Sequence, residues 1–591
     1  MGGVRQARGV LVLLARPARG AHPGAVVHAR TLDDAVLAPE RAVRWVWADT
    51  AAWYPRLLTD GVRVERCLDL RLAHHVLRAS AATATSDLAR APRGPFDAGP
   101  AEQAAEPDRP PTLFDTDDEP TTEAGQSDAD EDACLAEVAA QDAAVAGAAT
   151  PGRLRLLLAG ESAGALAAAE MRHTGLPWDV AAHDAVLREL LGDRPRRGER
   201  PGRMAALAAE VRDALDAPHL NPDSLPDVLR ALRRVGLDVT STRKWELQDV
   251  DHPAIAPLLA YKKLSRLHSA NGWAWLDQWV PDGRFRPEYV VGGVVTGRWG
   301  SSGGGALQIP RLLRGAVCAD PGWRLVVADA AQLEPRVLAG MARDERMSAA
   351  GAGKDLYAGM VDAGVVPERA LAKIGMLGAL YGGTTGASAA VLPRLLQAYP
   401  QAFGAVEAAA RAGERGEVVS TLLGRSSPRP DAAWSRVQAD ALDPDANDRA
   451  QSRARAQTRS WGRFTRNFVV QGTAAEWALC WIAELRRRLW ALGESTGTPG
   501  RAPAPFTARP HLVYFLHDEI VVHTPAGLAA EVAEQVTAAA TAAGRLLFGD
   551  FPVQFPLSVG AASSYADAKD AARLPWDEPL DQPVDDRADR S

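Results

Sequence analysis

The stretch Trp323–Arg336 reads WRLVVADAAQLEPR and joins an apolar strand, a lone carboxylate and a helix start. The residues before Asp329 are short, apolar and β-branched, which is typical of a buried strand. After Asp329 the pattern becomes helical, and Pro335 is tolerated there because the first turn of a helix leaves that amide unpaired anyway. A strand that delivers a carboxylate into a helix-starting turn is a geometry of metal and nucleotide sites. A solvated strand end without chemistry explains this stretch alone equally well.

A second stretch, Val513–His523, reads VYFLHDEIVVH. Apolar residues flank the polar centre His517-Asp518-Glu519 on both sides, which predicts a β-hairpin with a polar tip. Two strands that each present carboxylates can hold a pair of divalent cations. Such a pair, roughly 3.5–4 Å apart, is the clamp used by in-line phosphoryl displacement. The two stretches together therefore favour a metal site.

Length and composition predict a multidomain globular protein. The chain has 591 residues, too many for one core, and is 47% apolar and 24% charged. Its four cysteines are scattered without C-x-x-C spacing, which indicates a reduced compartment and no structural zinc site. No stretch is long and apolar enough for a signal peptide or a membrane span. We expect a cytoplasmic protein without a membrane partner.

The net charge of −7 is unevenly distributed. Thirteen acidic residues and one arginine lie between Asp97 and Asp132, and the tail 576–591 carries six acids and two arginines. The remainder of the chain therefore carries about +9, which is compatible with phosphate contacts. The proline-rich acidic segment is expected to be a disordered insertion or linker.

Three predicted helices carry polar stripes. On the predicted helix 256–268 the residues of the stripe are cationic. On the predicted helix 367–382, and on a later helix that contains residues 463–471, the residues of the stripe recur every four positions and so share one face. Cations and a phenol on one stripe suit a polyphosphate with a base stacked near its end, and the later stripe suits phosphates and base edges. Solvated surface stripes are the commoner explanation of each pattern taken alone. The stripes are Lys262, Lys263 and Arg266; Arg369, Lys373, Leu377 and Tyr381; and Arg463, Asn467 and Gln471.

With these segments in this order, the chain resembles the family A DNA polymerases, the DNA polymerase I type. VVADAAQLEPR is similar to their motif A, RALAKIGMLGALYG to motif B and LHDEIVV to motif C. TGRWGSSGGGALQIP, TLLGR and RNFVVQGTAAE lie in the expected places between and before these motifs. The resemblance covers about residues 155–575 and is nearest to an actinobacterial branch labelled bifunctional 3′–5′ exonuclease/DNA polymerase.

The resemblance implies an α+β multidomain fold, a right-hand (palm, fingers, thumb) polymerase with a degenerate ribonuclease H-like N-terminal domain. It places that exonuclease-like domain at 1–95, an acidic low-complexity insertion or linker at 96–150 and the thumb at 151–290. The palm is expected at 291–345 with 455–575, the fingers at 346–454 and an acidic tail at 576–591.

The resemblance also implies roles for single residues. Asp329 and Asp518 would hold two Mg²⁺ ions, with Mn²⁺ as an alternative, and Glu519 would support this catalytic site. The ions would lower the pKa of the primer 3′-hydroxyl and neutralise the triphosphate. The other implied contacts fall into two groups. Those to the nucleotide are Gln332, the sugar-gate Glu334, the phosphate-binding Arg369 and Lys373, Leu377 and the stacking Tyr381. Those to DNA are Lys262, Arg266, Arg298, Arg314, Arg463, Asn467, Gln471 and His517.

Two departures from the family pattern affect function. Leu377 occupies the motif B position where the family has an aromatic residue against the nucleotide sugar. The N-terminal region has no Asp-x-Glu on its first strands, Trp53 replaces a nuclease carboxylate, and Asp142 is a poor substitute in the third motif. Only Asp49 with Asp69 remains as a pair to test. We expect a vestigial domain without proofreading.

The sequence thus predicts a monomeric template-directed DNA polymerase of replication or repair, with primer–template DNA and deoxynucleoside triphosphates as partners. One alternative is a DNA-binding accessory protein with a decayed polymerase site. The other is a relative of the phage-type RNA polymerases, against which Glu334 argues, because that residue would exclude ribonucleotides.

Overall fold

The structure is a computed structural model, and it describes residues 11–15, 26–29, 43–98, 131–196, 198–303, 305, 309–382 and 386–576. Two predicted segments lie almost entirely outside these residues, the acidic stretch between 97 and 132 and the tail 576–591. In the described part of the chain, no helix is long and apolar enough to cross a bilayer.

A four-stranded antiparallel sheet, here called the central sheet, carries both stretches that the sequence singled out. Its order is β10 (His511–Leu516), β11 (Glu519–Pro525), β9 (Trp323–Ala330) and β12 (Leu557–Ala562). The predicted hairpin is β10–β11, and β11 pairs directly with β9. Strand β9 continues into α14 (Leu333–Ala342), as the sequence predicts, with Pro335 in its first turn.

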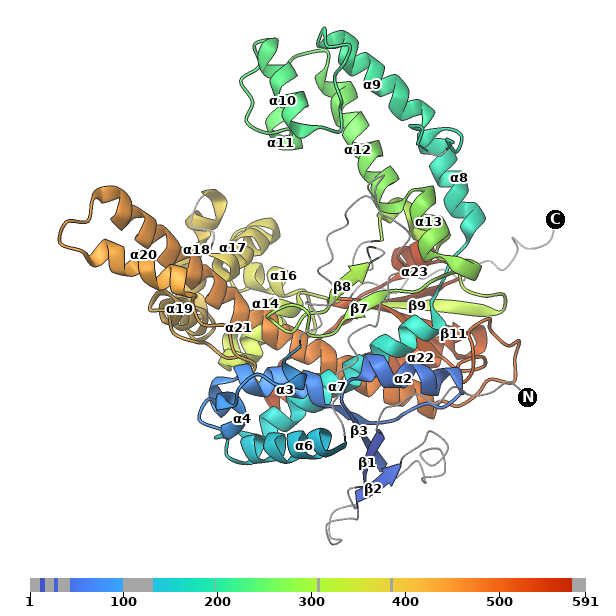
Figure 1. The fold of residues 1–591 in the computed structure, drawn as a ribbon, viewed down its shortest axis with the longest axis vertical. Coiled ribbons are helices and arrows are strands. Elements are labelled where there is room, and N and C mark those ends of the chain that lie inside the picture. Colours follow the sequence, from blue (N-terminus) through green and yellow to red (C-terminus); the bar gives the residue numbers. More distant parts are fainter. Residues whose placement is uncertain are drawn as a thin grey trace.

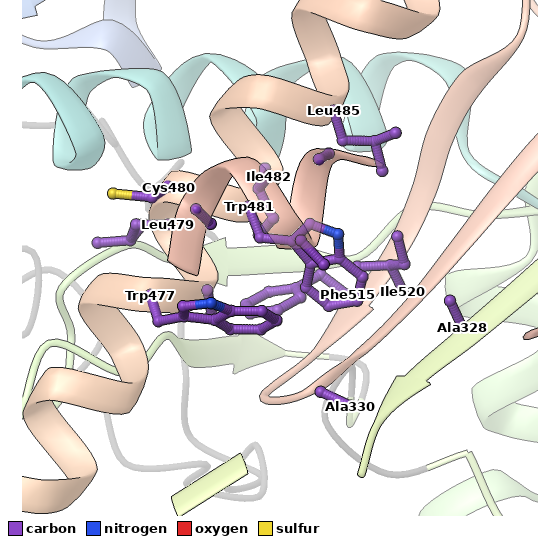
Figure 2. Packing of buried hydrophobic residues seen from close by; sticks show 14 of the residues in the cluster. Ala328, Ala330, Trp477, Leu479, Cys480, Trp481, Ile482, Leu485, Phe515 and Ile520 are labelled. Carbon is purple, nitrogen blue, oxygen red and sulfur yellow. The ribbon is translucent and has the colours of Figure 1, made fainter. Parts of the chain in front are cut away.

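Alternate residues of β9 face two different hydrophobic cores, as expected for a strand buried on both sides. Val326 and Ala328 belong to the core formed with α21 (Asp448–Ala491) and α22 (Ala529–Phe548). Trp477 and Trp481 of α21, whose ring centroids are 5.2 Å apart, pack in this core as Figure 2 shows. Leu325 and Val327 face the other core. Asp329 follows the odd-numbered series and so lies on this second face.

Two groups of helices extend from the central sheet, one upward and one to the left in the view of Figure 1. The first group, here called the helical arm, is α8 (Val180–Leu191), α9 (Gly202–Ala214), α10 (Leu225–Arg234), α11 (Lys244–Leu247), α12 (Ile255–Asn271) and α13 (Trp273–Trp279). The second group, here called the lateral helices, is α15 (Glu345–Ala350), α16 (Leu356–Asp362), α17 (Arg369–Tyr381), α18 (Gly386–Ala398), α19 (Pro400–Glu414) and α20 (Ala432–Leu442).

Short strands join the arm to the central sheet. They form two two-stranded antiparallel sheets, β5 with β6 and β7 with β8. Their bounds are Leu176–Pro177, Arg284–Phe285, Glu288–Val290 and Gly300–Gly303. After β12 the chain returns to the central sheet as the short helix α23 (Tyr565–Ala571).

The N-terminal part has its own four-stranded sheet, of order β2 (Val26–Ala29), β1 (Leu11–Ala15), β3 (Val43–Trp47) and β4 (Cys67–Asp69). Its helices are α2 (Thr50–Thr59), α3 (Leu70–Ala79) and α4 (Asp87–Arg90), and the long helix α7 (Pro151–Thr174) packs beside α2 and α3 (Figure 1).

Helix α6 (Glu131–Ala146) lies within the segment 96–150, where the sequence indicated a linker. Residues 131–146 are therefore an ordered part of the N-terminal region. The physical reason is packing, because Ala144 and Val145 are buried in the same core as Leu77 of α3 and Leu157 of α7. The acidic composition of the preceding residues concealed this alanine-rich helix.

A buried ionic cluster ties the N-terminal part to the body. Arg486 of α21 donates to Glu170 of α7 through Nε at 2.8 Å, and to the backbone oxygen of Glu65 at 2.8 Å. Tyr54 of α2 donates to the same Glu170 carboxylate at 2.6 Å. Although burial alone disfavours the carboxylate, Arg486 and Arg63 hold the pKa of Glu170 below its usual range. Three segments distant in sequence thus meet in one satisfied cluster.

Candidate active site

Three carboxylates meet where β9 and the β10–β11 hairpin end. Asp329 and Glu519 are direct cross-strand partners, so their side chains leave the sheet on the same face. Asp518 occupies the turn before β11, beside His517, which has a left-handed φ of 54°. The backbone oxygen of Asp518 accepts from the Ala330 amide at 2.9 Å, which fixes the turn against β9.

The pKa of Asp518 is raised to about 7, first by burial and second by the negative charge of Asp329. Two carboxylates that repel each other in a half-buried turn are a site that a divalent cation would stabilise, and carboxylate oxygen is the donor that Mg²⁺ and Mn²⁺ prefer. Among the described residues, however, no three His, Cys, Asp or Glu side chains converge as ligands. The donor set therefore fits a cation through the pair Asp329 and Asp518.

Glu519 is separated from this pair by partners of its own. It is buried and accepts from the Tyr565 hydroxyl and from the Lys569 ammonium, the latter at 3.0 Å. The same ammonium donates to Asp329 at 2.8 Å. Lys569, on α23, is thus a cation between two of the three carboxylates. Nothing in the sequence singles out Lys569, because an isolated lysine in this helix belongs to no motif.

A cavity of about 270 Å³ opens beside Asp518, between the central sheet, α14, α17 and α21. In its lining, Tyr381 donates to Glu334 at 2.6 Å, and Arg298 forms an ion pair with the same carboxylate. Burial and the Glu334 charge raise the pKa of Tyr381 to about 12. Seven of the residues singled out from the sequence line this cavity: Arg298, Gln332, Glu334, Leu377, Tyr381, His517 and Asp518.

Arg369 and Lys373 lie on α17 outside the lining of this cavity. Arg369 donates to the Asp355 carboxylate through both Nε, at 3.2 Å, and Nη2, at 2.7 Å. Asp355 also accepts from Gln332 at 2.6 Å. Lys373 is exposed and has no ion-pair partner among the described residues. Asp355 was missed by the sequence analysis, although an aspartate before the helix-forming LYAGM segment is a capping signal.

The remaining predicted DNA contacts are dispersed. Lys262, in the arm, donates to the Thr242 backbone oxygen at 2.5 Å, so its ammonium ties α12 to the loop before α11. Arg266 is exposed on the same helix. Arg314 stacks over the ring of Tyr565, 5.0 Å from its centroid. Along α21, the side chain of Gln471 lies against the Tyr381 hydroxyl, and those of Arg463 and Asn467 follow toward the start of the helix.

The pair Asp49 and Asp69 is engaged in the local fold. Asp69 is buried and accepts from the amides of Thr50 and Leu72, at 2.7 and 2.9 Å, so it caps the starts of two helices. Asp49 caps α2 and forms an ion pair with Arg71 at 3.1 Å. Burial and the Asp49 charge raise the pKa of Asp69 to about 7. The two carboxylates already have structural partners.

An antiparallel sheet with carboxylates at one end, flanked by two helical groups, defines the right-hand fold of the nucleotide polymerases. A domain of a solved structure, "POL domain of Pol1 from M. smegmatis complex with DNA primer-template and dNTP", has this fold. The similarity has a TM-score of 0.57 at 20% identity and covers 74% of this chain and 75% of that one. This agrees with the α+β, right-hand fold expected from the sequence.

The model of DNA polymerase family A matches residues 223–567. The chain therefore belongs to DNA polymerase family A. It is 27% identical over 438 residues to "DNA polymerase I, thermostable" of Thermus thermophilus, covering 68% of this chain and 47% of that protein. It is 28% identical over 324 residues to "DNA polymerase I" of Chloroflexus aurantiacus, covering 50% and 31%. The chain spans about half the length of the Thermus relative.

Proposed function

We propose that the chain is a template-directed DNA polymerase that adds deoxynucleotides to a primer 3′-hydroxyl. The observation that carries the proposal is the carboxylate pair Asp329 and Asp518 at the edge of the cavity containing Glu334 and Tyr381. Among the described residues, Lys569 donates to one oxygen of Asp329, and no ion pair engages Asp518. A site that needs positive charge next to a cavity of about 270 Å³ suits nucleotidyl transfer from a nucleoside triphosphate to a 3′-hydroxyl, with pyrophosphate as the leaving group.

Asp329 and Asp518 would hold two divalent cations, with Mg²⁺ as the expected metal and Mn²⁺ as an alternative. When bound, such ions supply positive charge opposite the charge that develops during phosphoryl transfer. Glu519 orients Lys569 and Tyr565 and so supports the pair indirectly. His517 and Arg298 lie at the cavity wall, where a primer end would lie.

The nucleotide would bind between α14 and α17. Lys373 is exposed and could contact a phosphate directly. Arg369 donates to the Asp355 carboxylate, so it would have to divide its donors between Asp355 and a phosphate or break its bonds to Asp355. Glu334 would lie where a ribose 2′-hydroxyl would clash, and Tyr381 would stack on the base. This use of Glu334 favours the DNA polymerase over a phage-type RNA polymerase. The helical arm is proposed as the thumb, the lateral helices as the fingers and the central sheet as the palm. Primer–template DNA would pass over the central sheet, between the arm and the lateral helices. The protein would act as a monomer.

We also infer that the N-terminal domain does not proofread. Two-metal hydrolysis of a phosphodiester needs several converging carboxylates. Asp49 and Asp69 are engaged by Arg71 and by backbone amides, and Trp53 lies on α2 where the family pattern has a carboxylate. Asp49, Asp69, Arg71 and Trp53 all belong to the part of the chain that the structure describes.

Primer extension tests the polymerase proposal. Asp329→Ala and Asp518→Ala should each lower the rate by ~1000-fold or more while duplex binding changes little, because the cations act mainly on the transition state. Lys354→Met, which removes a half-exposed lysine paired with Asp362, is the control. Normal rates in either aspartate variant would refute the assignment. Failure of the wild type to extend any primer would favour a decayed site, and equal use of ribonucleotides would favour the RNA polymerase alternative.

Excision of a mismatched 3′-terminal nucleotide, measured without nucleotides, tests the proofreading inference. The wild type should release no terminal nucleotide. Excision that persists in Asp329→Ala and disappears in Asp49→Asn would contradict the inference, because it would locate a nuclease in the N-terminal domain.

A further inference from the structure

One buried ion pair has no part in the proposed chemistry. Arg425, the last residue of the TLLGR segment (421–425), pairs with Glu161 of α7, and the two side chains are 12% and 1% exposed. Burial raises the pKa of Glu161, and the charge of Arg425 opposes this rise. Apolar side chains can often replace a buried ion pair without loss of stability. Stability alone therefore does not account for this pair, and its surroundings show what else it does.

The pair packs against the turn that precedes Arg298. This turn comprises residues 292–297. Gly297 has a φ of 85°, and a Cβ at this position would lie 2.6 Å from Arg425 Nε. Glycine therefore allows the guanidinium to lie directly against the backbone of the turn. The next residue is Arg298, whose side chain lines the cavity and pairs with Glu334.

The atoms of the pair that face this turn have no other partner. Arg425 Nε and Glu161 Oε2 are buried, and neither forms a hydrogen bond with any described residue. Glu161 Oε2 lies 3.4 Å from the position that a Cβ of Gly292 would take, at the start of the same turn. The two side chains thus contact the turn at its two ends. The ion pair between them holds these contacts at a fixed separation.

The segment that carries Arg425 is itself fixed from two sides. Glu476 of α21 accepts from the Leu423 amide at 3.0 Å. The Leu423 side chain is buried in the core that α3 and α7 form in the N-terminal domain. Ser80 of the same domain donates to the Gly424 oxygen at 2.7 Å. Arg425 is therefore attached to rigid elements, and the turn before Arg298 rests on it.

A shift of this turn would move Arg298 relative to the Glu334 carboxylate, to which Tyr381 also donates. Displacements of about 1 Å in a positioning group can change a rate by roughly two orders of magnitude. We propose that Arg425 and Glu161 are positioning residues for Arg298 and, through it, for the Glu334 side chain that selects the sugar. The proposal rests on the proposed polymerase function, because sugar selection belongs to that reaction. It goes further by giving a role to two residues outside the lining of the cavity.

Hydrogen exchange of the free protein tests the positioning step without catalysis. The test variants are Glu161→Gln and Arg425→Met, and mass spectrometry follows the amides of residues 292–299. The control is Glu170→Gln, the same substitution in another buried carboxylate of α7 that pairs with an arginine. All proteins are compared at a temperature at which each is fully folded. If a single variant does not fold, Glu161→Leu/Arg425→Met takes its place, because it leaves no charge buried without a partner.

Both test variants should exchange these amides about threefold faster than the wild type, or more, because the turn opens locally once its support is lost. The control should exchange them at the wild-type rate. Unchanged exchange in the test variants would overturn the proposal, and so would equally faster exchange in the control.

Sugar selection tests the link to Arg298. It is measured as the ratio of kcat/KM for deoxynucleotides to kcat/KM for ribonucleotides. Glu161→Gln should lower this ratio by about three- to tenfold in the wild-type background and should have no further effect in Arg298→Ala, because a residue that acts through another adds nothing once the other is removed. Glu170→Gln should leave the ratio unchanged.

Effects of Glu161→Gln and Arg298→Ala that simply multiply would overturn the proposal, because they would show that the two residues act independently. Failure of the wild type to extend any primer would refute the polymerase proposal instead. The hydrogen exchange would then still decide whether the pair positions the turn.

Discussion

A single residue, Lys569, places a positive charge inside the carboxylate site. Its ammonium contacts Asp329 at 2.8 Å and Glu519 at 3.0 Å, so a divalent ion at Asp329 must compete with it for a carboxylate oxygen. Lys569→Met should therefore tighten Mn²⁺ binding by about three- to tenfold, as expected when a partly buried ion pair is removed. Titration of Mn²⁺ followed by electron paramagnetic resonance measures this without catalysis. Unchanged or weaker binding, relative to Lys354→Met, would contradict the prediction.

The pKa of Asp518 predicts how the metal-free protein responds to pH. The carboxyl has a pKa of about 7 in the folded state, against about 3.9 when unfolded, so the folded state holds the proton more tightly. Its contribution to stability is therefore present at low pH and is lost as the pH rises from about 4 to about 7. Asp518→Asn should remove this loss and raise the free energy of unfolding at pH 8 by on the order of 2 kcal/mol. Denaturant unfolding in chelator at pH 5 and pH 8 measures the difference, which should be smaller at pH 5.

At the scale of elements, Glu334 and Tyr381 join α14 to the end of α17, and Leu377 faces the same cavity one turn earlier. Leu377 has neither a ring to lie against a deoxyribose nor a hydroxyl to replace a missing 3′-hydroxyl. The wild type should therefore discriminate strongly against dideoxynucleotides, and Leu377→Tyr should relax this discrimination by about tenfold or more. Competition between dideoxy and deoxy nucleotides in primer extension measures the ratio. Equal use of both by the wild type would place Leu377 away from the sugar.

Elements were predictable where a periodic pattern or a motif was strong. The strand before Asp329, the hairpin around Asp518 and the helix carrying Arg369 are present within a few residues of their predicted bounds. Contacts between distant segments were not predictable, because nothing in a local pattern reports them. Lys569 donates to Asp329, which lies 240 residues earlier in the chain. Arg369 donates to the Asp355 carboxylate, and no local sequence pattern indicates that these two residues meet. Helix α6 was not predicted, because the acidic, proline-rich composition of the residues before it indicated a linker for the whole segment 96–150.

At the scale of the whole molecule, the cluster of Arg486, Glu170 and Tyr54 makes the N-terminal domain part of the body. Arg486→Met should destabilise the protein by about 3–5 kcal/mol, because it leaves Glu170 buried without its main counter-charge. Arg487→Met, one residue away on the exposed side of α21, should change stability little. Thermal unfolding measures both. Similar melting temperatures for the two variants would show that the cluster does not hold the domain in place.

The same cluster has a consequence for the newly made chain. Tyr54 precedes Arg486 by 432 residues, and at ~5–20 residues per second a ribosome needs on the order of 20–90 s to cover that interval. During that time Tyr54, Glu65 and Glu170 have been synthesised, but the guanidinium that joins them has not. The N-terminal domain therefore stays incompletely closed until Arg486, 432 residues after Tyr54, has been synthesised. During that interval the buried faces of α2 and α7 are open to chaperones that bind nascent chains.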